Sequence, residues 1–96
     1  MDSKLIISYD PVANSIYVTV ADGQEVGFGE TLVGEDGTII DTDAQGKPRG
    51  YEFLMVREKP LSLTDLPGQV ARALSDFLSS GALDAEDSIE RQYEAS

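Results

Sequence analysis

The feature that most constrains this fold is a change of hydrophobic period near residue 57. Before it, short apolar runs alternate with polar residues; after it, apolar residues recur about every 3.6 positions. In residues 15–20, Ile16 and Val18 share one face and Tyr17 lies on the other, which predicts a half-buried strand. The chain is therefore expected to form a sheet first and a helix afterwards.

Turn residues separate the expected strands. Asp10 and Pro11 end the first apolar run, because proline donates no ladder hydrogen bond, and Asn14 turns the chain back. Gly46 is expected to adopt a positive φ in the turn of a later hairpin. The expected strands cover residues 4–9, 15–20, 30–33, 38–43 and 49–56.

The second part of the chain is predicted to hold one helix, over residues 64–81, after a connector at residues 57–63. Gly81 is a natural stop for this helix. Its apolar stripe comprises Leu66, Val70, Leu74, Phe77 and Leu78. Residues 84–96 carry five acids and one base, and they are expected to form a flexible acidic tail.

These elements predict the fold class α+β. The expected architecture is an antiparallel β-meander sheet of four or five strands with one C-terminal α-helix packed on it. Residues 1–83 are expected to form a single domain, since a chain of 96 residues suffices for one core.

Four segments follow one another in a recognisable order: Tyr9-Asp10-Pro11, residues 15–20, residues 38–43 and residues 50–54. This order resembles the family named domain of unknown function 2283, found in short bacterial and phage proteins. The resemblance covers residues 5–56 and implies the β-rich part of the fold. Family members are similar to small partner proteins that often sit beside toxin-like genes, so the resemblance implies an antitoxin-like or regulatory role.

The composition argues against catalysis. The sequence contains no cysteine and no histidine, so thiolate nucleophiles, a Ser-His-Asp arrangement and sites with cysteine or histidine metal ligands are absent. We therefore expect a non-catalytic protein-interaction module, with no catalytic residue, cofactor or bound metal. The longest apolar runs are three or four residues, which predicts a cytoplasmic protein that does not contact membranes.

The net charge of −11 limits the possible partners. Direct binding to nucleic acid phosphates is disfavoured, whereas a basic protein partner is electrostatically allowed. An alternative function is therefore a phage-encoded acidic decoy that occupies the nucleic-acid-binding site of a host protein. The charge is uneven: residues 1–43 hold nine acids and one base, whereas residues 44–63 hold two acids and four bases.

One segment approaches a calcium-binding loop, with Asp41, Asp43, Gln45 and Glu52 at the ligand positions and Gly46 at the turn position. The flanking residues alternate as strands instead of forming helices, so we favour a β-hairpin whose Asp41 and Asp43 point to solvent. The same two aspartates lie on one strand face, as paired carboxylates of a hydrolase would. A carboxylate-based enzyme or calcium-binding module is the second alternative function.

The aromatic residues of the strands are the candidate interface. The fifth strand looks apolar on both faces, and a single helix cannot cover both of them. We therefore expect a homodimer, because large apolar patches are uncommon on soluble monomers. The candidate interface residues are Tyr9, Tyr17, Tyr51, Phe53 and Met55.

Overall fold

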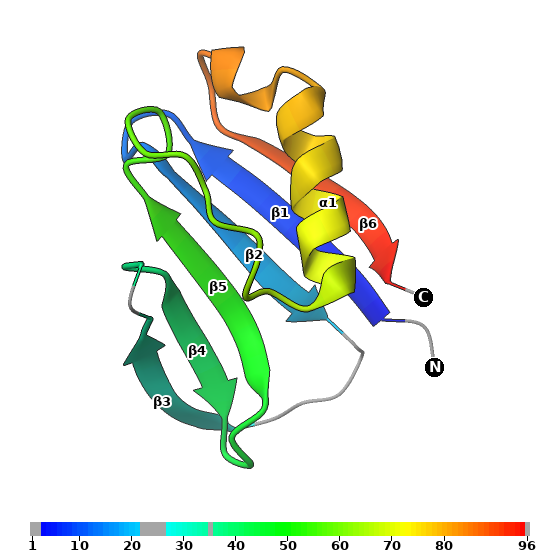
Figure 1. Cartoon of the computed structure of the whole chain (residues 1–96). Helices are drawn as coiled ribbons and strands as arrows, with labels where there is room; N and C mark the ends of the chain where they lie inside the picture. Colours follow the sequence, from blue (N-terminus) through cyan, green and yellow to red (C-terminus); the bar gives the residue numbers. More distant parts are fainter. Residues whose placement is uncertain (1–2, 22–26, 35, 96) are drawn as a thin grey trace.

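The structure is a computed structural model that describes residues 3–21, 27–34 and 36–95. One helix lies across one face of an antiparallel sheet (Figure 1). The elements, in chain order, are β1 (Ser3–Asp10), β2 (Ser15–Ala21), β3 (Phe28–Val33), β4 (Ile39–Asp43), β5 (Pro48–Leu54), α1 (Gly68–Ser79), the 3-10 helix η1 (Ala82–Asp84) and β6 (Ile89–Ala95). The predicted α+β class is confirmed.

The described residues form a six-stranded sheet in the order β3-β4-β5-β2-β1-β6, with antiparallel neighbours throughout. The expectation of four or five strands in a meander needs two corrections. A sixth strand is present, and β5 takes the place beside β2 that a meander would give to β3. The reason is burial: Tyr51 and Phe53 make β5 suitable for the middle of the sheet, whereas every residue of β3 is exposed.

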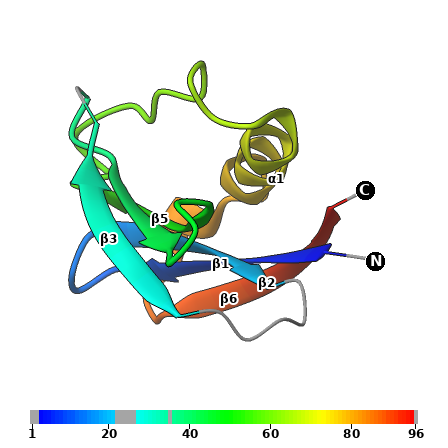
Figure 2. The same cartoon turned by 90° about the horizontal axis from the view of Figure 1, so that it is seen from below.

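The core lies between α1 and the sheet. Ile7 pairs with Val18, and Val18 pairs with Tyr51, so the buried side chains of three neighbouring strands stand in one row. Ile16 and Val18 are fully buried, which confirms the predicted core face of β2. Figure 2 shows α1 on the concave face of the curved sheet, with β3 far from the helix. We call this concave face the inner face and the opposite one the outer face.

The helix packs as its sequence pattern predicts. Val70, Leu74 and Phe77 are buried, and α1 contacts β1 and β6. It begins at Gly68, later than the predicted residue 64, because proline disfavours helical geometry in the residue before it and Pro67 itself is extended. No helix in the described part of the chain is long and apolar enough to span a membrane.

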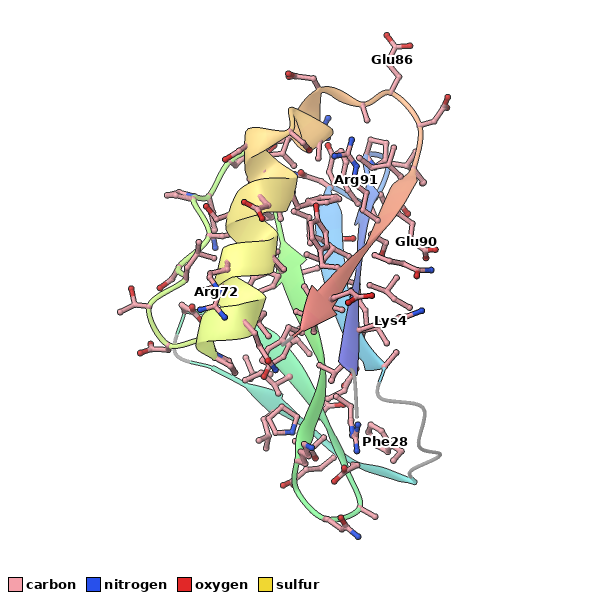
Figure 3. The ribbon with its side chains drawn as sticks, turned by 90° about the vertical axis from the view of Figure 1, so that its right-hand side faces the viewer. Lys4, Phe28, Arg72, Glu86, Glu90 and Arg91 are labelled. Atoms are coloured by element: carbon pink, nitrogen blue, oxygen red, sulfur yellow. The ribbon has the colours of Figure 1, made fainter. Side chains whose placement is uncertain are left out.

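The expected flexible tail over residues 84–96 is wrong for its second half. Ile89–Ala95 form β6, which pairs with β1 along its whole length. Ile89 and Tyr93 pack against the core, while Glu90 faces away from α1 (Figure 3). The prediction relied on the acidic composition of this segment and overlooked its alternation, in which the apolar residues Ile89 and Tyr93 pack against the core.

The end of β5 also differs from the prediction, which continued this strand to residue 56. The strand ends at Leu54, and Met55 has a φ of 56°. This left-handed residue interrupts the alternation, so Val56 enters the core and Met55 is 48% exposed.

Candidate functional site

The segment that resembles a calcium loop is the hairpin between β4 and β5. Gly46 has a φ of 83°, as predicted. Asp43 Oδ1 accepts hydrogen bonds from the backbone N–H groups of Gln45 and Lys47, both at 2.9 Å, and its Oδ2 lies 3.0 Å from Arg49 Nε. Asp43 is 2% exposed, so the expectation that it points to solvent is wrong. The turn needs its carboxylate as an acceptor for these donors.

These hydrogen bonds also fix the charge of Asp43. The N–H of Lys47 lowers the pKa of the carboxyl group most, and Arg49 lowers it further, against the opposing effect of burial. The carboxylate is therefore ionised and bound within its own hairpin.

The second carboxylate of the motif belongs to a polar contact on the outer face. Asp41 accepts hydrogen bonds from the Tyr17 hydroxyl at 2.7 Å and from the Thr31 hydroxyl at 2.8 Å. Burial, followed by the hydrogen bond to Asp41, raises the pKa of Tyr17 to about 12. Asp41 is half-buried, so its expected position in open solvent is also corrected.

The geometry around Asp41 and Asp43 disfavours the binding of a metal ion between them. Their oxygens already accept hydrogen bonds from protein donors. Asp41 bonds to side chains of β2 and β3, whereas Asp43 bonds to residues of its own hairpin. Within the described residues, no group of three or more acidic side chains is arranged to hold a metal ion.

The candidate interface is divided by the fold. Tyr9, Tyr51 and Phe53 are 5% exposed or less and belong to the core beneath α1, so they are not available to a partner. Tyr17 lies on the outer face, and Met55 is exposed at the end of β5. The prediction failed because the strand pattern alone does not reveal which face a distant helix will cover.

The two edges of the sheet differ in their surface chemistry. All six residues of β3 are exposed, including Phe28, Leu32 and Val33, and Glu30 is its one charged residue. On β6, Glu90 faces away from α1 and Arg91 faces toward it (Figure 3). Charged side chains and bulges on an edge strand discourage pairing with another chain. They occur along β6 but on β3 only before Thr31, as Glu30 and a register shift, so residues 31–33 are left unprotected.

The backbone of β3 also offers hydrogen-bonding groups to a partner. The N–H and C=O of Glu30 face β4, where both bond to the Thr42 hydroxyl, and the N–H of Gly34 bonds to Thr38. Because backbone groups alternate in direction along a strand, those of Thr31 and Val33 point away from the sheet. Sequence analysis identified a short strand here but not its edge position, which depends on the pairing of β5 with β2.

Comparison with known proteins supports the family resemblance. Residues 6–57, just over half of the chain, match the model of a family described as protein of unknown function (DUF2283). No curated protein and no solved structure matches the chain. The matched segment begins in β1 and ends just after β5, so it contains β3 but neither α1 nor β6.

Proposed function

Because the chain belongs to the DUF2283 family, whose description states no activity, we propose a function from the geometry: a non-catalytic interaction module that pairs with a second copy through β3. The observation that carries this proposal is the unprotected edge. Phe28 and Val33 are 70% and 72% exposed, on a strand with outward-facing backbone groups. The proposed partner surface replaces the expected one, because most of the aromatic residues lie in the core.

The pairing that fits this edge best is antiparallel, with Leu32 opposite Leu32 of the second copy. Thr31 of each copy then faces Val33 of the other, and their outward backbone groups can exchange hydrogen bonds. Leu32 is on the inner face, since it pairs with Ile40, and Val33 is on the outer face. Shifting the second copy by two residues would place Glu30 against Leu32, which loses the apolar contact.

Charge opposes this dimer only weakly at the contact. In the favoured pairing Glu30 faces Gly34 of the other copy, so no two acids stand directly opposite each other. The remaining repulsion between two chains of charge −11 is long-range and is screened by salt. An acidic dimer of this kind suits an antitoxin-like or regulatory role, in which a basic protein is the second partner.

Light scattering coupled to size exclusion tests the proposal. At high micromolar concentration and moderate salt we expect about twice the 10.3 kDa chain mass, and a larger dimer fraction as salt rises. Leu32→Lys should give a monomer, because it places two lysines opposite each other. Gln92→Lys, which adds the same charge to the β6 edge, is the matched control.

Two results would overturn the proposal. One is a mass near that of a single chain for the unmodified protein under these conditions. The other is an equal loss of dimer in Leu32→Lys and Gln92→Lys, which would show an effect of total charge instead of edge pairing.

A further inference from the structure

A second surface, which adjoins the β3 edge at Gly34, is hollowed on the inner face. The helix contacts β1 and β6, and the segment that leads to α1 passes over the β4 end of the inner face (Figure 2). Two adjoining hollows of about 420 Å³ and 240 Å³ lie beneath this segment. Asp36, Thr38 and Ser62 line both of them, so the two hollows are neighbours, and we call them together the trough.

The floor and rim of the trough differ chemically. Ile40 and Leu66 form the apolar floor of the larger hollow, and Asp36 and Asp65 are the charged residues that line it. Lys59 lines only the smaller hollow. A hydrogen bond from the Thr38 N–H, at 3.0 Å, lowers the pKa of Asp36 and keeps its carboxylate ionised. The larger hollow therefore combines an apolar floor with a negative rim.

We propose that this trough binds an extended, basic segment of a partner protein, in which arginine or lysine side chains alternate with apolar ones. Side chains of an extended chain point alternately to opposite sides, so the apolar ones can contact Ile40 and Leu66 while the basic ones reach the rim. Charge complementarity selects this occupant: the rim of the larger hollow is acidic, and so is the whole chain. The inference goes beyond self-association and does not rest on it.

The test uses nuclear magnetic resonance of the isotope-labelled full chain with an acetylated, amidated hexapeptide of alternating leucine and arginine. We expect saturable shifts of backbone signals at Ile40, Ser62 and Leu66, which line the trough and take no part in the proposed pairing of β3. A hexapeptide of alternating leucine and glutamate should not bind, and one of alternating glycine and arginine should bind at least about threefold more weakly, because it lacks apolar contacts.

Two variants separate the trough from general acidity. Asp36→Asn combined with Asp65→Asn should weaken binding by about threefold to tenfold, as expected for two exposed ion pairs. Glu86→Gln combined with Asp87→Asn removes the same charge at the turn before β6, away from the trough, and should leave binding unchanged (Figure 3). Equal weakening in both double variants would overturn the proposal.

A third variant tests the shape of the trough without changing charge. Ser62 is exposed and lines both hollows, so Ser62→Trp should fill the trough and abolish the localised shifts. Ser75→Trp, at an exposed position on α1, is its control. Spectra of the free variants establish that they are folded. Undiminished peptide binding by folded Ser62→Trp would show that the trough is not the binding site.

Discussion

At the scale of single residues, Tyr17 joins the middle of the sheet to its exposed edge. Its ring lies over Gly50 on β5, where an added Cβ would overlap the phenol. Its hydroxyl reaches Asp41 on β4, which also accepts a hydrogen bond from Thr31 on β3. One carboxylate thus links β2 and β3 across two intervening strands. The absent side chain at Gly50 is what permits this crossing.

This contact predicts an effect of Tyr17→Phe. Removing a hydrogen bond to an ionised carboxylate should lower the free energy of unfolding by about 1–2 kcal/mol. The pKa of Tyr17 is raised from 10.0 to about 12, so the folded state favours the protonated phenol. Its contribution is therefore complete below pH 10 and is lost as the pH rises toward 12.

Urea unfolding at about pH 8 and about pH 11 measures this contribution. The unmodified protein should lose more stability than Tyr17→Phe between these two conditions. Tyr93→Phe, at a half-buried tyrosine of β6, is the control and should behave as the unmodified protein does. Equal losses in the unmodified protein and Tyr17→Phe would contradict the assigned hydrogen bond.

At the scale of elements, α1 is held to the sheet by its buried stripe. Phe77 is fully buried, and Phe77→Ala should lower the free energy of unfolding by about 3–5 kcal/mol through lost burial and a cavity. Ser75→Ala, on the exposed side of the same helix, should change it by less than about 0.5 kcal/mol. Chemical denaturation followed by circular dichroism compares them. A Phe77→Ala loss as small as that of Ser75→Ala would mean that the helix does not cover the core.

The strands and the helix also show which parts of the fold the sequence can predict. Val18 and Phe77 were placed correctly in the core, because a hydrophobic period fixes the face within one strand or one helix. The edge position of β3 and the burial of Tyr51 depend on which strands pair across long separations, and local patterns do not contain that information. The candidate interface and the flexible tail were mispredicted for this reason. The trough was missed because it forms between segments that meet only in the folded chain.

At the scale of the whole molecule, the net charge is −11, but no group of three or more acidic side chains among the described residues is arranged to hold a metal ion. Isothermal titration should detect no calcium binding at submillimolar concentration, because Asp41 and Asp43 already accept hydrogen bonds from Tyr17, Thr31, Lys47 and Arg49. Glu86→Gln serves as a charge control for any diffuse cation effect. Saturable binding that Asp41→Asn abolishes would show that the hairpin rearranges to hold the ion.

The pairing of β1 with β6 has a consequence for how the chain folds. Ser3 lies opposite Ala95, so the register joins positions 95 − 3 = 92 residues apart. A contact of such long range forms only after a large loop has closed, which costs entropy before any packing repays it. Folding speed should therefore depend on the meeting of β1 and β6 more than on the formation of the helix. During synthesis, β1 can pair with β2 early, but its pairing with β6 forms only after β6 has been synthesised.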